Sequence, residues 1–342
     1  MSYRTLGIVG AGAWGTALAV AAARAGKSVV LWAREPDVVE AIARARVNRA
    51  FLPDIALPEN ISATGDLARA ASCEAVLLVT PAQHTRVVAR ALEAHLSADT
   101  PILICAKGIE GGTGALMSEV VAETLPGRKL AVLSGPSFAA EVARFLPAAL
   151  TLATDDDEIG ARFVETLSGP LLRLYRGDDM AGAQVGGAVK NVVAIACGVV
   201  MGRKLGDNAR AALITRGLHE MTRLARAKGG KAETLMGLSG LGDLVLTCTG
   251  EQSRNLSFGL ALGRGGRAGD LLTSRRSVVE GASTAASVAA LATSLGIEMP
   301  ICRAVDEVAN RGADLEATIE ALLARPAGGH EYIRNRPNAT GR

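Results

Sequence analysis

Leu6-Gly-Ile-Val-Gly10-Ala-Gly12-Ala13-Trp14-Gly15 is the stretch of this 342-residue sequence that decides its fold. An apolar run of strand length, residues 6–9, leads into three glycines spaced G-x-G-x-x-G, and an Ala-rich segment of helical length follows. In such a unit the first glycine permits a tight turn, the second lets the backbone approach a pyrophosphate, and the third lets the helix pack closely on the strand. The helix N-terminus also presents N–H groups to the phosphates. The motif therefore predicts dinucleotide binding by Gly10, Gly12, Ala13, Trp14 and Gly15.

The same alternation of strand and helix continues beyond this motif. Strands are expected at 6–9, 28–32, 75–79, 101–105, 129–133, 149–153 and 171–175, and helices at 14–25, 37–46, 83–95, 114–123 and 156–167. The strands are continuous apolar runs, which is typical of a parallel sheet covered on both faces. From residue 180 onward only helical segments broken by Gly-rich turns follow.

This pattern predicts an α/β fold, in which an N-terminal Rossmann-like doubly wound sheet precedes an all-helical C-terminal domain. We expect a dinucleotide-binding domain at 1–180 and a helical substrate-binding domain at 181–328. The residues at 329–342 lack apolar periodicity, so a flexible tail is expected there. Ala-rich helical faces suit internal packing and a homodimer equally well.

Composition excludes several classes of function. The formal net charge is only +3 and aromatic residues make up 3%, which disfavours a nucleic-acid partner. The five cysteines form no C-x-x-C pair and the four histidines are far apart, so no metal site is expected. No basic leader segment precedes the first strand, and the apolar run at 192–201 is half the length that crosses a bilayer. A cytoplasmic protein without a membrane span is expected.

Arg34 follows the second strand, at the position where an acidic residue usually binds the ribose of NAD. A guanidinium there would pair with a 2′-phosphate, so NADPH is expected to be accepted. A solvated surface arginine is the plain alternative, and the neighbouring Glu35 could still reach the ribose of NADH.

Five further motifs occur in a specific order along the chain. They are Ala106-Lys-Gly-Ile-Glu110, Ser134-Gly-Pro-Ser-Phe-Ala139, Gly186-Gly-Ala-Val-Lys-Asn191, Gly240-Leu-Gly-Asp-Leu244 and Ser253-Arg-Asn255. Together with the glycine loop they resemble the bacterial-type NAD(P)-dependent sn-glycerol-3-phosphate dehydrogenases, from Gly10 to about Glu280. The resemblance implies interconversion of dihydroxyacetone phosphate and sn-glycerol 3-phosphate, which supplies phospholipid synthesis.

The resemblance implies that Lys190 is the general acid/base, and chemistry agrees with this role. Reduction of a ketone leaves an alkoxide that needs a proton and a nearby positive charge, and a lysine supplies both. Lys107 follows a strand at the ligand-binding edge, and the resemblance implies that it contacts both substrate and cofactor. Asp243 would hold Lys190 or a substrate hydroxyl, with Thr247 as its neighbour. The plain alternatives are a snorkelling Lys190, a surface Lys107 and a helix-capping Asp243.

The remaining expected contacts also come from the resemblance. Arg254 offers a guanidinium fork for a phosphate and also touches the cofactor, although a Ser-Arg-Asn triplet alone is commonly a helix cap. The substrate-binding residues are expected to be Lys107, Gly135, Ser137, Lys190, Asp243, Thr247, Ser253, Arg254 and Asn255. Further cofactor contacts are expected from Lys107, Ala139, Arg254, Val279 and Glu280.

Two departures from the family pattern stand out. After Asn255 the chain continues Leu-Ser-Phe-Gly where a more basic run is expected, which predicts weaker phosphate affinity. The segment 263–277 is longer than usual and suits a variable surface loop or a lid.

Two other functions fit the same sequence. A β-hydroxyacid dehydrogenase would place a substrate carboxylate against Arg254, and a non-catalytic dinucleotide sensor would bind the cofactor without turnover. Substrate profiling separates the first from the expected activity, and turnover itself separates the second.

Overall fold

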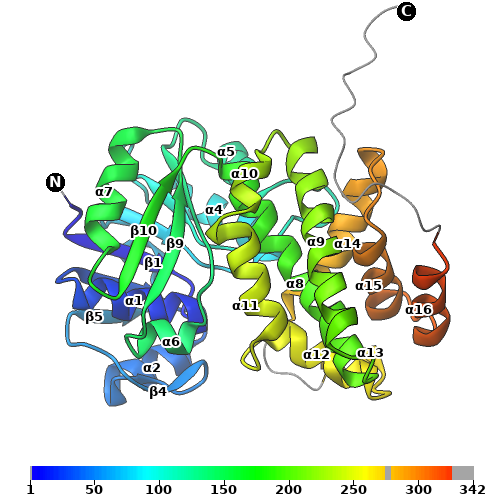
Figure 1. The fold of residues 1–342 in the computed structure, drawn as a ribbon. Coiled ribbons are helices and arrows are strands. Elements are labelled where there is room, and N and C mark those ends of the chain that lie inside the picture. Colours follow the sequence, from blue (N-terminus) through cyan, green and yellow to red (C-terminus); the bar gives the residue numbers. More distant parts are fainter. Residues whose placement is uncertain (1, 274–278, 326–342) are drawn as a thin grey trace, which may run out of the picture.

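The computed structural model describes residues 2–273 and 279–325, which form a twisted sheet beside a helical bundle (Figure 1). The eight strands of the sheet lie in the order β10-β9-β8-β7-β6-β1-β2-β5. Their bounds in that order are Leu172–Gly177, Ala148–Ala153, Leu130–Ser134, Ile102–Ile104, Ala75–Leu78, Thr5–Val9, Ser28–Trp32 and Ile61–Thr64. The doubly wound α/β fold with a helical C-terminal part is therefore confirmed.

Helices cover both faces of the sheet, because its strands carry apolar side chains on both sides. These are α1 (Ala13–Arg24), α2 (Pro36–Ala45), α3 (Leu67–Ala71), the 3-10 turn η1 (Ala82–His84), α4 (Thr85–Glu93), α5 (Met117–Thr124), α6 (Ala139–Ala143) and α7 (Asp157–Leu167). Aspartates set two of the boundaries. The carboxylate of Asp66 accepts from the N–H of Ala68 at the start of α3, and that of Asp156 accepts from two N–H groups at the start of α7.

Two strands, β9 and β10, run against the expected direction. β8 and β9 are antiparallel, with Val132 opposite Ala153, whereas the alternating pattern predicted parallel pairing throughout. A parallel crossover needs a connection that returns along the whole strand length. The connection between these two strands contains only the five-residue helix α6, which is too short for that return. β10 is again parallel to β9.

Several small elements were absent from the sequence prediction. The hairpin β3 (Val47–Asn48) and β4 (Leu52–Ala56), the edge strand β5 and the helices α3 and α6 are all short. Short elements produce little periodicity, and tertiary packing stabilises them instead.

The bundle is built around the long helix α8, Met180–Gly202 (Figure 1). The other helical elements are α9 (Asp207–Ala227), α10 (Ala232–Leu235), the π-helical turn η2 (Leu238–Gly242), α11 (Asp243–Thr249), α12 (Arg254–Gly263), α13 (Ala268–Thr273), α14 (Glu280–Ser294), α15 (Pro300–Asn310) and α16 (Leu315–Leu323). Within the described residues, α8 alone is long and apolar enough to span a membrane. However, 83% of its most apolar window is buried inside the fold, so it is the core helix of the bundle.

Helices α8 and α12 pack backbone against backbone. A Cβ atom at Gly198 of α8 would lie 2.1 Å from the carbonyl oxygen of Leu256, and one at Gly259 of α12 would lie 2.0 Å from that of Ile195. Only glycine permits such an approach. We call this contact the glycine seam.

Two predicted segments fall partly or wholly outside the described residues. The segment 263–277 was expected to be a loop, and its first part instead forms α13, while 274–278 are not described. The expected flexible tail at 329–342 lies outside the described residues.

Candidate active site

The predicted catalytic residues Lys107, Lys190 and Asp243, together with the predicted substrate contact Gly135, meet where the carboxyl edge of the sheet faces the helical bundle. Lys107 lies in the loop after β7, Gly135 lies in the turn after β8, and Lys190 lies on α8. Asp243 is the first residue of α11. In sequence these groups are up to 136 positions apart, and only the fold brings them together.

A single buried carboxylate bridges the two lysines. The Lys107 Nζ atom lies 2.8 Å from Asp243 Oδ2, and Lys190 Nζ pairs with the other oxygen, Oδ1. Asp243 is fully buried, and the side chains of Lys107 and Lys190 are only 13% and 9% exposed. Lys107 also donates to the carbonyl oxygen of Gly135 at 3.0 Å. The two ammonium groups are therefore held close together in a site that is largely shielded from water.

Burial lowers the pKa of Lys190 to about 8. Removal from water disfavours the charged amine, and the neighbouring Lys107 acts in the same direction, whereas Asp243 opposes both by stabilising the charge. A lysine with such a pKa can both donate and accept a proton near neutral pH. The snorkelling alternative fails, because the ammonium group of Lys190 points to a buried carboxylate.

Thr247 lies one turn after Asp243 on α11. Its hydroxyl donates to the backbone oxygen of Asp243 at 2.6 Å and lies 3.5 Å from Oδ1. This contact restrains the carboxylate between the two lysines.

The turn after β8 is shaped by a glycine. Gly135 has φ +138°, and a Cβ atom there would lie 3.1 Å from the Cα of Leu150 on β9. The hydroxyl of Ser137 donates to the carbonyl oxygen of Gly135 at 3.0 Å, and Ala139 begins α6. The turn thus brings backbone groups next to Lys107.

The expected phosphate clamp lies at the start of α12. The hydroxyl of Ser253 accepts from the N–H of Leu256 at 3.2 Å, so this side chain does cap the helix. Arg254 is exposed at the first helical position. The Asn255 amide joins two other helices: Nδ2 donates to Asn191 Oδ1 at 2.9 Å, and Oδ1 accepts from the N–H of Gly281 at 3.0 Å.

Glu280 adds a second carboxyl group beside the cations. It is the first residue of α14, and the partly exposed Glu280 follows the buried Val279. Burial raises the pKa of Glu280, and the nearby positive charges of Arg254, Lys107 and Lys190 oppose that rise. Glu280 therefore lies within electrostatic reach of both the lysine pair and the start of α12.

The glycine loop has the geometry that a pyrophosphate requires. Gly10 has φ +119° and a Cβ there would lie 2.8 Å from Val79, while a Cβ on Gly15 would lie 1.9 Å from the Gly10 oxygen. A Cβ on Gly12 would meet no atom within 4 Å, so this side of the loop is open. The Nε1 atom of Trp14 is buried and has no hydrogen-bond partner within the described residues. The open face at Gly12 fits the close approach of a pyrophosphate.

Arg34 and Glu35 lie at the end of β2 and contact each other. The guanidinium Nη2 atom is 3.0 Å from Glu35 Oε1, and the side chains are 73% and 40% exposed. An exposed pair of this kind contributes little to stability, so the guanidinium is able to turn toward a 2′-phosphate.

Several residues near the site were not singled out as site residues from the sequence. Asn191 binds the Asn255 amide, and the motif containing Lys190 already included it. Glu110 forms a two-fold hydrogen-bonded pair with Arg86 on α4, which holds the loop that carries Lys107. Buried Ser134 lies beside Gly187, where a Cβ would approach its Oγ atom to 2.7 Å. The sequence indicated a role for Asn191, Glu110, Ser134 and Gly187 only in that they belong to the quoted motifs.

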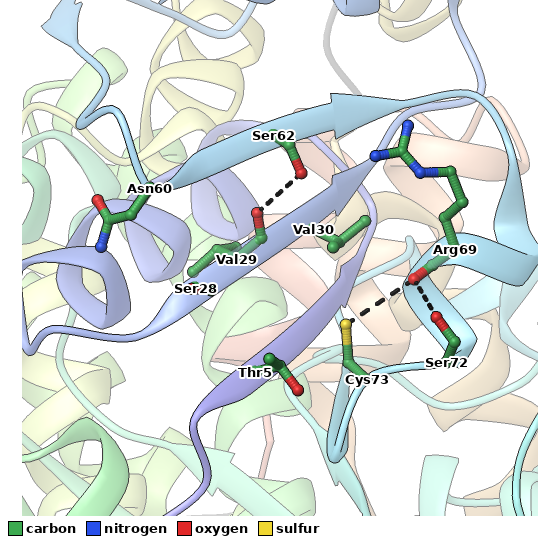
Figure 2. Close-up of a pocket in the computed structure, with 9 residues that line it drawn as sticks. All are labelled: Thr5, Ser28, Val29, Val30, Asn60, Ser62, Arg69, Ser72 and Cys73. Carbon is green, nitrogen blue, oxygen red and sulfur yellow. Dashed lines mark hydrogen bonds between the residues drawn. The ribbon is translucent and has the colours of Figure 1, made fainter.

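A separate cavity of about 320 Å³ lies at the opposite edge of the sheet (Figure 2). It is lined by Thr5, Ser28, Val29, Val30, Asn60, Ser62, Arg69, Ser72 and Cys73. Thr5 and Ser28 begin their strands, so this cavity lies at the amino edge. Ligands of doubly wound folds bind at the carboxyl edge. The lysine pair, and not this cavity, therefore marks the candidate active site.

Comparisons with known proteins show what the whole chain is similar to. The model of the NAD-dependent glycerol-3-phosphate dehydrogenase N-terminus matches residues 5–160, and that of the C-terminus matches residues 179–320. A glycerol-3-phosphate dehydrogenase [NAD(P)+] of Parvibaculum lavamentivorans is 52% identical over 326 residues, which are 95% of this chain and 98% of that protein. One from Paramagnetospirillum magneticum is 62% identical over 75% of this chain and 93% of its own length. The crystal structure of glycerol-3-phosphate dehydrogenase from Coxiella burnetii is 43% identical, with a TM-score of 0.91, and the match covers 94% of this chain and 99% of that one.

Proposed function

Because this chain belongs to the NAD-dependent glycerol-3-phosphate dehydrogenase family, we propose that it interconverts dihydroxyacetone phosphate and sn-glycerol 3-phosphate. It is an NAD(P)-dependent oxidoreductase that acts on a CH–OH group. The observation that carries the assignment of the site is the buried carboxylate of Asp243 between Lys107 and Lys190. Two ammonium groups at one point suit a reaction in which a ketone oxygen becomes negatively charged.

The nicotinamide ring, when bound, supplies a hydride to C2 of the ketone or takes one from the alcohol. The proposed role of the protein side chains is to protonate the oxygen at C2 and to stabilise its negative charge. Lys190 donates a proton from Nζ as that oxygen gains charge, and Lys107 binds the oxygen and stabilises the charge. Asp243 holds both ammonium groups in place and keeps Lys190 protonated near neutral pH. In the reverse direction the neutral amine of Lys190 takes the proton from the alcohol.

The substrate phosphate is proposed to bind at the start of α12. Arg254 offers two N–H groups in a planar fork, and the helix N-terminus adds a favourable dipole. Because the Asn255 amide already bridges two helices, we propose that it contributes its remaining N–H. The other proposed substrate contacts are Gly135, Ser137, Thr247 and Ser253.

The cofactor is proposed to lie across the carboxyl edge of the sheet, from Arg34 to the lysine pair. The pyrophosphate would approach the open side of Gly12, and NADPH or NADH is accepted. The proposed contacts are Gly10, Gly12, Ala13, Trp14, Gly15, Arg34, Lys107, Ala139, Arg254, Val279 and Glu280.

We further propose a division into a dinucleotide-binding domain at 1–180 and a substrate-binding domain at 181–328. We also propose a cytoplasmic location, a role in phospholipid synthesis and a homodimer. The mass of the purified protein in solution tests the last of these.

Turnover of NADPH with dihydroxyacetone phosphate tests the proposed function. Oxidation of NADPH should be lost in Lys190→Ala, while calorimetry should show NADPH binding close to that of the wild-type protein. Lys228→Ala is a matched control, because Lys228 is also a mostly buried lysine, 2.7 Å from the Glu119 carboxylate. That variant should keep its activity.

The same assay separates the alternatives. Turnover of hydroxyacids in place of glycerol 3-phosphate would indicate a β-hydroxyacid dehydrogenase. Tight NADPH binding without turnover of any substrate would indicate a dinucleotide sensor.

A further inference from the structure

The hairpin that follows α2 sends one polar side chain into the interior, toward the glycine loop. Asn48 on β3 is fully buried, and its amide Nδ2 donates to the carbonyl oxygen of Ala11 and to Thr16 Oγ1, both at 2.8 Å. Its Oδ1 atom accepts from the N–H of Phe51 at 3.3 Å, which fixes which end of the amide faces the loop. A buried amide with all of these partners is held in one orientation.

The bond to Ala11 fixes the direction of a neighbouring N–H group. In a trans peptide unit the C=O and the following N–H point in opposite directions. Because Asn48 holds the Ala11 oxygen on the inner side, the N–H of Gly12 faces outward. The Gly12 oxygen is also occupied, since it accepts from the N–H of Thr16 at 2.9 Å.

The space beside Gly12 is open, because a Cβ on this residue would meet no atom within 4 Å. No acceptor contacts the Gly12 N–H in the part of the chain that the structure describes. A preorganised N–H binds an anion better than one that must turn on binding, because the peptide unit loses no conformational freedom when the anion binds.

We propose that Asn48 is a positioning residue for the cofactor, which orients the Ala11–Gly12 peptide so that the Gly12 N–H faces the pyrophosphate. Thr16 assists, because its hydroxyl accepts from Asn48 and lies 3.4 Å from the Ala11 oxygen. This inference rests on the proposed dinucleotide site. It assigns a role in cofactor binding to a hairpin outside the glycine motif.

Asn60 provides a matched control at the other end of the same helix. Its Nδ2 atom donates to the carbonyl oxygens of Ala23, in the last turn of α1, and of Lys27, just after the helix, both at 2.7 Å. Asn48→Ala and Asn60→Ala therefore each remove two hydrogen bonds donated by a side-chain amide, one pair near the start of α1 and the other at its end. Both variants should melt at a lower temperature than the wild-type protein.

The dissociation constant for NADPH, measured by calorimetry, distinguishes positioning from mere stabilisation. In Asn48→Ala it should rise about tenfold, as expected when a preoriented hydrogen bond is lost. Binding of NADH should weaken by the same factor, because both cofactors share the pyrophosphate. In Asn60→Ala both constants should stay within about twofold of the wild-type values, and the KM for dihydroxyacetone phosphate should be unchanged in both variants.

Equal NADPH affinity in Asn48→Ala and Asn60→Ala would overturn the inference. If Asn48→Ala does not fold, the test uses Asn48→Ser, whose hydroxyl is a shorter donor. A severalfold loss of NADPH affinity in Asn48→Ser supports the inference, and an NADPH affinity equal to that of the wild-type protein overturns it. Wild-type protein that binds no dinucleotide would refute the proposed function, whereas wild-type binding with unaffected Asn48 variants would refute this inference alone.

Discussion

Replacing Asp243 by Asn removes the only charge described between Lys107 and Lys190 while it keeps the shape of the side chain. Breaking a buried ion pair by removing one partner costs about 4 kcal/mol. Divided equally between the two lysines, this cost is about 2 kcal/mol for Lys190, which corresponds to a fall of about 1.5 units in the pKa of Lys190. The pKa falls because the carboxylate stabilises the charged amine, so without it Lys190 loses its proton at lower pH.

The assay is the pH dependence of kcat for reduction of dihydroxyacetone phosphate. In the wild-type protein the rate should fall as pH rises through about 8, because the protonated amine of Lys190 is the proposed donor. In Asp243→Asn the same fall should occur about 1.5 pH units lower, so that at pH 9 the variant is about 30-fold slower than the wild-type protein. Acidification to pH 6 should recover most of the rate.

Asp306→Asn is the matched control, because Asp306 is also a buried carboxylate, 2.8 Å from the Nε atom of Arg311 on the far side of the bundle. Its pH profile should coincide with that of the wild-type protein. A loss of rate in Asp243→Asn that is equal at every pH would refute the reasoning, because Asp243 would then act on the substrate or the fold and not on the proton of Lys190.

Three further predictions follow from single contacts. Arg34→Ala should raise the KM for NADPH about tenfold and leave that for NADH unchanged, since only NADPH carries a 2′-phosphate; an unchanged ratio of the two KM values would remove Arg34 from cofactor selection. Arg254→Lys should raise the KM for dihydroxyacetone phosphate about tenfold, because lysine keeps the charge but lacks the planar fork of N–H groups. Arg264→Lys, at the other end of α12, is the control and should leave this KM unchanged. Equal KM values in the two variants would argue against a phosphate clamp at Arg254. Gly198→Ala should lower the free energy of unfolding by about 3 kcal/mol, because the added methyl group collides with backbone, while Gly269→Ala in the open helix α13 should be neutral or slightly stabilising. Denaturant unfolding measures both glycine variants, and a stable Gly198→Ala protein would contradict the close approach of the two helices.

Much of the fold could be predicted from the sequence, because its long elements carry strong periodic signals. Strand β2 has the predicted bounds, and the helix after the glycine loop differs by one residue at each end. The directions of β9 and β10 were predicted wrongly, because the short helix α6 between β8 and β9 gave no periodic signal. The hairpin at β3 and β4 was missed as well, since β3 has two residues and Pro53 and Asp54 interrupt the apolar residues of β4.

The candidate site was predictable residue by residue, but not as a constellation. The motifs named Lys107, Lys190 and Asp243, and only the fold shows that one carboxylate serves both lysines. Asn48 was beyond reach of the sequence, because nothing in its local surroundings indicates that its side chain crosses to the glycine loop 37 positions earlier.

The glycine seam between α8 and α12 sets a limit on how this enzyme can be redesigned. Lys190 and Arg254 project from these two helices, and where the helices touch there is no side chain whose size could be altered to move them apart. With Lys190 at the reacting carbon and Arg254 at the phosphate, as proposed above, the seam fixes the length of substrate that fits between them. A variant for a longer phosphorylated ketone is then better sought elsewhere, for example in the turn that contains Gly135 and Ser137, because any larger residue in the seam would collide with backbone.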